Sequence, residues 1–421
     1  MSASDRIEAD YLIETAVDPR RAAEVVAGEQ SSGTFVTLPG ETPELKARSA
    51  ARIERLDILD DQVDSPSLPG AIRKDGSTLL RARVTISWPL DTVGACLPTL
   101  VATVAGNLFE LKEVSGLRLL DLRLPSAFAE RYLGPQFGIE GTRRLSGVAT
   151  DPLIGTIVKP SVGLTSAQTA ELVAELCRAG IDFIKDDELQ CDSPACPFEE
   201  RVRAVMRVIN LHAEKTGKRV MYAFNLSGEL SQMQARHDVV LEHGGTCVMA
   251  SLNAVGLAGM IALREHSQLP IHAHRNGWGV LSRAPLLGWS YVAWQKLWRL
   301  AGADHMHVSG LANKFSESDD SVIASAKTCL TPMFEHKPCI SMPVFSSGQS
   351  AVQPPETYRQ LGSADLIYVA GGGIMAHPGG PADGVQSLRD AWDAAIAGID
   401  AVEYSKTHPA LAQALETYSK H

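Results

Sequence analysis

From Leu153 onward, short apolar runs alternate with longer segments in which apolar residues recur at helical spacing. This alternation is typical of βα units, which assemble into a parallel sheet. Eight such units occupy about 270 residues, the usual size of a (β/α)₈ barrel. The predicted strands read LIGTIVKP, DFIKDDE, VMYAFNLSG, CVMASLNAV, PIHAHRNG, HMHVSGL, CISMPVFSSG and DLIYVAGGG.

The first 147 residues have a different pattern. IEADYLIET and TLLRARVTISWPL are strand-like, whereas PRRAAEVVAGEQ and TVGACLPTLVATVAG have helical spacing. The turn-rich stretch DQVDSPSLPGAIRKDGST is predicted to join two strands, and GPQFGIEGTRR is predicted to link two domains. We therefore predict an α/β protein with an N-terminal α+β, ferredoxin-like domain over residues 1–147 and a C-terminal (β/α)₈ TIM barrel over residues 148–421.

Composition narrows the classes of protein. Hydrophobic residues make up 45% and charged residues 21% of 421 positions, and no apolar run reaches the length of a membrane span. The acidic N-terminus lacks the pattern of a signal peptide, and seven scattered cysteines form no CxxC pair, so we expect a cytoplasmic protein with reduced thiols. A net charge of -10 disfavours a nucleic-acid surface.

Polar residues fall at the carboxyl ends of seven of the eight predicted strands, the face where barrel active sites are built. A buried lysine or carboxylate without a partner would cost several kcal/mol, so this arrangement predicts a shared ligand. The strand-end residues are Lys159, Asp186 to Glu188, Asn225, His274 with Arg275, His307, Ser346, and Gly371 to Gly373.

The second strand ends in Lys185-Asp186-Asp187-Glu188. Lys185 and Asp187 share a strand face, and Glu188 can turn inward where the strand ends. Carboxylates of this kind suit Mg²⁺, which takes about six oxygen ligands. Lys185 would then be either a charge partner or, after reaction with CO₂, an anionic carbamate. A salt-bridged barrel rim without metal is the alternative.

Lys159 ends the first strand and could remove a proton beside a carbonyl, bind phosphate, or form a Schiff base. Arg275 suits bidentate phosphate binding, and His274 can donate a hydrogen bond or move a proton. Serine and glycine residues after strands seven and eight occupy the positions where barrels frequently bind phosphate through backbone amides.

These motifs, in this order and over nearly the whole chain, resemble the large subunit of RuBisCO, and more closely its non-carboxylating relatives, the RuBisCO-like proteins. The most specific stretches are GPQFGIEG, DPLIGTIVKPSVGLT and AGIDFIKDDE, and the N-terminal GEQSSGTF and GNLFELKEVSGLRLLDLRLP also match.

The resemblance implies that Lys159 abstracts a proton and that a carbamate on Lys185 completes a Mg²⁺ site with Asp187 and Glu188. It implies catalytic roles for His274 and for Lys314 on a mobile loop. Substrate and phosphate contacts are implied for Arg275, His307, Ser346, Gly348, Gly371 and Gly372, and contacts to a neighbouring subunit's site for Glu29, Thr34 and Asn107. A homodimer or an assembly of dimers is therefore expected.

The sequence departs from carboxylating members at three places. Ser161 stands where they have a second lysine, Phe35 follows the threonine of the N-terminal motif, and ANKFSES around Lys314 lacks flanking glycines. We therefore expect no carboxylation of ribulose bisphosphate.

The remaining machinery favours a Mg²⁺-dependent lyase that forms an enediolate from a phosphorylated sugar-derived substrate. IEADYLIET, GEQSSGTF and HVSGLANKF look nearest the relatives of apiose catabolism. The leading hypothesis is thus decarboxylation or carbon–carbon cleavage of a β-keto acid like 3-oxo-isoapionate 4-phosphate. The alternatives are an isomerase or enolase of a 5-methylthioribulose 1-phosphate type substrate, and a phosphate-binding protein without catalysis.

Overall fold

The computed structural model describes residues 6–32, 39–72 and 78–419, and it divides into two compact units. The first unit contains residues 1–132 and 277–300, and the second contains residues 133–276 and 301–421. Each unit therefore combines two separate stretches of the chain. The single domain boundary expected after residue 147 stays a prediction.

The first unit is built on a five-stranded sheet with the order β10-β4-β1-β3-β2. Strand β1 (Arg6–Thr15) pairs antiparallel with β3 (Leu79–Pro89) and with β4 (Gly116–Arg123). Strand β2 (Arg52–Val63) continues the sheet beyond β3, and β10 (Leu287–Trp289) runs parallel to β4. The two strands predicted in this part of the chain are confirmed.

Helices cover this sheet because alternate residues of β1 are apolar and buried. Tyr11 is one of them, and its hydroxyl donates to the backbone oxygen of Val104 at 2.7 Å. The helical elements of the unit are α1 (Pro19–Glu29), α2 (Pro43–Ser49), α3 (Leu90–Val93), α4 (Leu97–Ala105), the 3-10 helix η2 (Asn107–Glu110), α5 (Ser126–Arg131), α11 (Trp278–Ser282) and α12 (Tyr291–Leu300).

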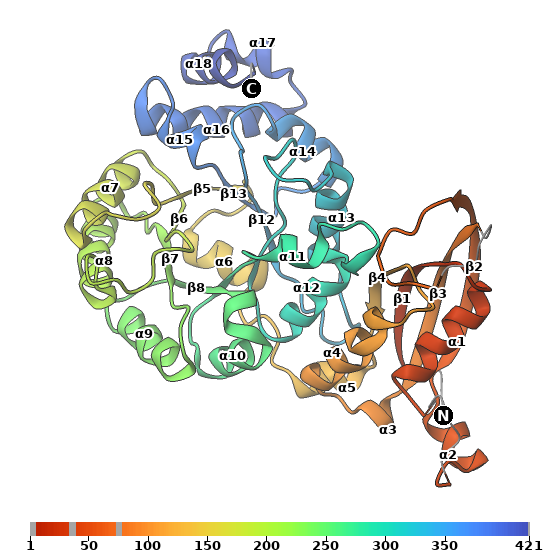
Figure 1. The fold of residues 1–421 in the computed structure, drawn as a ribbon. Helices are drawn as coiled ribbons and strands as arrows, with labels where there is room; N and C mark the ends of the chain where they lie inside the picture. The colour runs from red at the N-terminus through yellow and green to blue at the C-terminus, as the bar shows by residue number, and fades with distance from the viewer. Residues whose placement is uncertain (1–5, 33–38, 73–77, 420–421) are drawn as a thin grey trace. The chain divides into compact units, whose positions relative to one another are not determined.

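The second unit is a closed barrel of eight parallel strands, as the sequence predicts. The strands are β5 (Leu153–Ile157), β6 (Phe183–Lys185), β7 (Met221–Asn225), β8 (Cys247–Ser251), β9 (Ile271–His274), β11 (His305–His307), β12 (Met342–Phe345) and β13 (Ile367–Val369). Helices such as α7 to α10 pack around the outside of the barrel (Figure 1).

The helices of the second unit are α6 (Gly138–Ser146), α7 (Ser166–Arg178), α8 (Phe198–Thr216), α9 (Leu230–Glu242), α10 (Leu252–His266), α13 (Asp319–Leu330), α14 (Pro354–Leu361), α15 (Gly372–Met375), α16 (Gly380–Ala397), α17 (Ala401–Ser405) and α18 (Pro409–Tyr418). Within the described residues, no helix combines the length and the apolar character that a membrane crossing needs.

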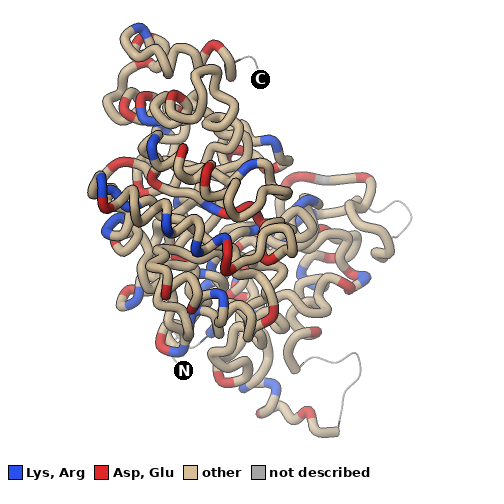
Figure 2. Tube along the Cα trace, turned by 90° about the vertical axis from the view of Figure 1, so that its left-hand side faces the viewer, with Lys and Arg blue, Asp and Glu red and all other residues tan. Residues whose placement is uncertain are grey.

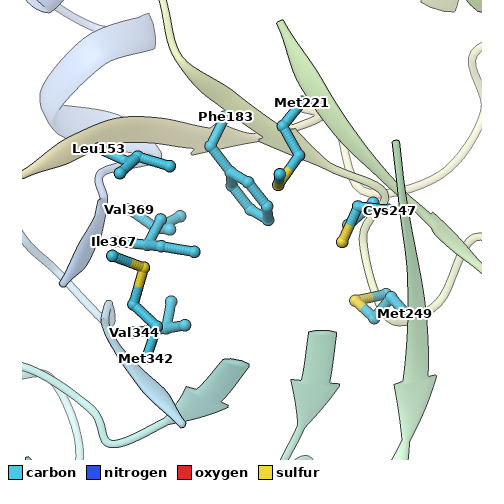
Figure 3. Packing of buried hydrophobic residues seen from close by; sticks show 10 residues of the cluster. Leu153, Phe183, Met221, Cys247, Met249, Met342, Val344, Ile367 and Val369 are labelled. Carbon is cyan, nitrogen blue, oxygen red and sulfur yellow. The ribbon is translucent and has the colours of Figure 1, made fainter. Parts of the chain in front are cut away.

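Apolar side chains of neighbouring strands point into the barrel interior, as Figure 3 shows. They come from six strands and comprise Leu153, Phe183, Met221, Ala223, Cys247, Met249, Met342, Val344, Ile367 and Val369. Strands β9 and β11 instead carry buried histidines, among them His272 and His305. One sector of the core is therefore polar.

Asp304 fixes α6 against this polar sector. Its fully buried carboxylate accepts from the backbone nitrogens of Phe137 and Gly138 at 2.7 and 3.0 Å. It also accepts from the backbone nitrogen of Ile271 at 2.9 Å and pairs with Arg264 at 2.9 Å. Burial raises the pKa of Asp304, although these donors oppose the shift. The start of α6 is thereby held beside β9 and β11.

Candidate active site at the barrel mouth

The polar layer at the barrel mouth follows from the two-residue period of the strands, which returns each second side chain to the interior. In β6, β7 and β8, and directly after β12, the position two residues after an inward core side chain is polar. These positions hold Lys185, Asn225, Ser251 and Ser346. The sequence prediction that functional groups gather at strand ends is consistent with this placement.

Lys185 lies beneath the two predicted metal-binding carboxylates. Its side chain is 1% exposed, and its Nζ donates to the backbone oxygen of Asp186 at 2.7 Å and lies 3.7 Å from Glu188 Oε2. Burial lowers the pKa of Lys185, while the carboxylates of Glu188 and Asp187 act in the opposite direction. Only a neutral amine reacts with CO₂, so burial favours the form from which a carbamate is made.

Asp186 has a different role from its two acidic neighbours. Its carboxylate is fully buried, accepts from Tyr222 Oη at 2.6 Å and from the backbone nitrogen of Asn225 at 2.9 Å, and pairs with Arg201 at 3.2 Å. All of these groups are protein donors. Asp186 therefore fixes the end of β6, and Asp187 and Glu188 remain as candidate ligands.

Lys159 follows β5 by two residues and reaches the Asp187 carboxylate. Its Nζ donates to Asp187 Oδ2 at 2.7 Å and to Ser161 Oγ at 2.6 Å. Burial would raise the pKa of Asp187, but the hydrogen bonds from Lys159 and from the backbone of Leu189 outweigh burial and lower it. The side chain of Lys159 is 42% exposed, so it is open to a ligand.

His274 and Arg275 close β9 beside this group. His274 Nε2 lies 3.5 Å from Glu188 Oε2, and burial together with the charge of Lys185 lowers the pKa of His274 to about 4. It is therefore a neutral imidazole at pH 7. Arg275 forms an ion pair with Glu317, which belongs to the segment that carries Lys314.

The loops after β11 and β12 approach each other at Lys314. Gly348 has a φ of +80°, and a Cβ atom built there would lie 3.7 Å from the backbone nitrogen of Lys314. The Lys314 Nζ lies 5.3 Å from the centre of the Phe315 ring. Below these loops, Ser346 Oγ is hydrogen-bonded to His307 Nδ1 at 3.1 Å.

The glycines after β13 leave the backbone open. A Cβ atom built on Gly371 would meet only Ile157 within 4 Å, and one built on Gly372 would meet nothing. Gly373 differs, because its Cβ would lie 2.6 Å from the backbone oxygen of Gln349. Gly371 and Gly372 can therefore present backbone to a ligand, whereas Gly373 is required for packing.

The residues assigned to a neighbouring subunit's site all belong to the first unit. Glu29 ends α1 and Asn107 begins η2. Thr34 lies outside the described residues, as does Phe35. Their contribution to catalysis stays a prediction.

One cluster was missed by the sequence reasoning. Asp238 Oδ1 lies 2.9 Å from His237 Nδ1 and 2.7 Å from His266 Nε2, and these are ligand atoms that could hold a metal ion. However, His237 Nε2 accepts from the backbone nitrogen of Gln268 at 3.2 Å, which places the ring proton on Nδ1. The cluster is therefore better described as a hydrogen-bonded clamp between α9 and α10.

The charge distribution is mixed. Basic and acidic residues are interspersed along the chain in Figure 2.

Comparison with known families matches almost the whole chain. Residues 4–128 match the N-terminal domain of the ribulose bisphosphate carboxylase large chain, and residues 138–418 match its catalytic domain.

Individual relatives extend this similarity. A protein of Xanthobacter autotrophicus named 3-oxo-isoapionate-4-phosphate transcarboxylase/hydrolase is 58% identical over 98% of this chain and 99% of its own length. A 3-oxo-isoapionate-4-phosphate decarboxylase of Rhizobium rhizogenes is 46% identical over 97% of each chain. The crystal structure of a RuBisCO-like protein from Burkholderia fungorum is 48% identical, with a TM-score of 0.92 over 98% of this chain and 99% of that one.

Proposed function

The chain belongs to the RuBisCO large-chain family, and we propose that it cleaves a carbon–carbon bond in a β-keto sugar acid like 3-oxo-isoapionate 4-phosphate. Relatives at 58% and 46% identity carry names for reactions of that compound, one a transcarboxylase/hydrolase and one a decarboxylase. The observation that carries the proposal is the contact of Lys159 with Asp187, both of which act electrostatically on the buried Lys185.

Ser161 supports a reaction other than carboxylation of ribulose bisphosphate. Where carboxylating relatives are expected to have a second lysine, Ser161 Oγ accepts a hydrogen bond from Lys159. The site therefore holds one ammonium group here instead of two. One cation suits a substrate with one phosphate and a carboxylate better than a bisphosphate, because less negative charge must be balanced.

Magnesium fits the donor set. Asp187 and Glu188 supply hard carboxylate oxygens, and a carbamate on Lys185 would add a third, which is the ligand chemistry that Mg²⁺ prefers. The buried Nζ of Lys185 faces these carboxylates, as such a ligand must. Bound there, the ion would act as a Lewis acid on the oxygens of the keto group.

Residues of this chain would then have separate roles in the reaction. When the bond between the α-carbon and the carboxylate breaks, the carboxylate leaves as CO₂, and the electron pair of the bond moves into the adjacent carbonyl to give an enediolate. Lys159, which donates to Asp187, would deliver a proton to that carbon. Burial lowers the pKa of His274, and its imidazole can donate one hydrogen bond to a developing oxyanion.

Phosphate recognition is proposed for Arg275, for Lys314, and for the open backbone at Gly371 and Gly372. Glu317 now neutralises Arg275, so a bound phosphate would compete with this carboxylate. Movement of the loop that carries Glu317 and Lys314 is therefore expected to accompany binding. We also propose a homodimer as the active unit, which sedimentation analysis of the purified protein would test.

The test uses 3-oxo-isoapionate 4-phosphate labelled with ¹³C at its carboxylate, with Mg²⁺ and bicarbonate. Release of label as CO₂ indicates decarboxylation, and retention in an organic acid indicates carboxyl transfer followed by hydrolysis. Lys159→Ala should abolish both, while Lys215→Ala, an exposed lysine on α8, should not. An unchanged substrate, or carboxylation of ribulose bisphosphate, would refute the proposal.

A further inference from the structure

A continuous chain of hydrogen-bonded side chains runs through the polar sector of the barrel core. Thr142 Oγ1 on α6 lies 2.7 Å from His305 Nε2, and the Nδ1 atoms of His305 and His272 are 3.4 Å apart. His272 Nε2 lies 2.7 Å from His307 Nε2, and His307 Nδ1 lies 3.1 Å from Ser346 Oγ. All five side chains are at most 7% exposed.

The three imidazoles in this chain are neutral. Burial lowers the pKa of His305 to about 3, and burial lowers those of His272 and His307 well below the ordinary value. A neutral imidazole has one N–H donor and one bare nitrogen acceptor. Each ring must therefore accept at one nitrogen and donate at the other, so the direction of one hydrogen bond sets the direction of all.

Thr142 sets that direction. Its Oγ1 lies 2.5 Å from the backbone oxygen of Gly138, and two oxygens at this separation need a hydrogen between them. A carbonyl cannot donate, so the single hydroxyl hydrogen of Thr142 points to Gly138. Thr142 must then accept from His305, whose proton lies on Nε2.

The remaining protons follow in order. The bare Nδ1 of His305 accepts from Nδ1–H of His272, and the bare Nε2 of His272 accepts from Nε2–H of His307. The bare Nδ1 of His307 then accepts the hydroxyl hydrogen of Ser346. Ser346 Oγ is left with lone pairs toward the barrel mouth and no hydrogen to offer.

We propose that Thr142 is a positioning residue that acts through His305, His272 and His307 to make Ser346 a hydrogen-bond acceptor toward the substrate. Ser346 would then recognise a hydroxyl group of the sugar acid, and a phosphate or carboxylate oxygen would be disfavoured at that point. This inference rests on the proposed function for the identity of the ligand. The proton positions do not depend on it.

Neutron crystallography of the deuterium-exchanged full-length protein tests the proton positions directly. We expect deuterium on Nε2 of His305 and His307 and on Nδ1 of His272. Deuterium on Nδ1 of His307, or on both nitrogens of any of the three rings, would overturn the proposal. If the expected positions are found and no β-keto acid is cleaved, the hydrogen-bond chain stands and the proposed function fails.

Thr142→Val removes the acceptor while keeping the branched shape. His305 Nε2 then has no hydroxyl on α6 to donate to or accept from, so neither direction of the hydrogen bonds along the histidines is favoured. Deuterium on His307 should therefore divide between Nε2 and Nδ1. We expect kcat/KM to fall about twofold if both directions are equally populated, and about tenfold if the whole hydrogen bond to substrate is lost. Thr142→Ser, which keeps the hydroxyl, should restore both readouts.

Thr357→Val is the matched control. Thr357 on α14 is also fully buried, and its hydroxyl also donates to the carbonyl four residues earlier, at 2.9 Å. Among the described residues its hydroxyl bonds to the Gln353 carbonyl and to no histidine, so this variant should lose similar stability without a change in kcat/KM. Equal kinetic effects of Thr142→Val and Thr357→Val would overturn the positioning role.

Discussion

Replacement of three consecutive acidic residues should separate stability from activity. In Asp186→Asn the buried Arg201 loses its charge partner, and the new amide nitrogen replaces an oxygen that accepts either from Tyr222 or from the backbone nitrogen of Asn225. Removing one partner of a buried ion pair costs about 3–5 kcal/mol. Asp187→Asn loses an ion pair with the half-exposed Lys159, which is worth about 1 kcal/mol or less.

The measurement is urea unfolding followed by circular dichroism, beside turnover of the labelled β-keto acid. Asp186→Asn should unfold at a much lower urea concentration than the wild type. Tyr222→Phe removes one hydrogen bond to the Asp186 carboxylate and should be about 2 kcal/mol less stable than the wild type. Asp187→Asn and Glu188→Gln should unfold near the wild-type midpoint and lose turnover. The reasoning is wrong if Asp186→Asn is as stable as Asp187→Asn.

Three further predictions concern the same barrel. Lys185→Met should abolish activation by Mg²⁺ and bicarbonate. Isothermal titration with Mg²⁺ and turnover after preincubation of the enzyme with Mg²⁺ and bicarbonate would show this. Retained activation would exclude the carbamate. Lys159→Ala should still bind substrate but form no deuterium-labelled product in D₂O, as a binding titration and NMR of the reaction mixture would show. Because His305 and its neighbours have lowered pKa values, the unfolded state binds more protons below about pH 6.5. Stability should therefore fall from there toward pH 3 by up to about 1.4 kcal/mol per pH unit for each histidine, and a pH-independent urea midpoint would contradict this.

The barrel could be predicted from sequence because its signal is local and repeated. Each strand is a short apolar run followed by a helix, and most strands have polar residues at or just after their carboxyl ends. The grouping of Lys159 with Asp187 and Glu188 follows from adjacent strands β5 and β6 alone. No long-range information was needed for these contacts.

Other features depend on contacts that leave no local pattern. Strand β10 has three residues and pairs with β4, about 170 positions earlier. The clamp around Asp238 joins the last turns of two helices. The direction of the buried histidine chain depends on Thr142, whose position in α6 looks like any helical threonine in the sequence.

The return of residues 277–300 to the first unit has a consequence for the order in which the protein is made. The ribosome completes the sequence of β1 to β4 early, but β10, α11 and α12 emerge only after five barrel strands have been synthesised. Domains generally fold as units during synthesis, the N-terminal one first. Here the N-terminal sheet cannot be completed, and the edge of β4 stays unpaired, until β10 has been synthesised up to residue 289. For the same reason, chimaeras made by a single crossover between family members would pair one parent's β4 with the other parent's β10.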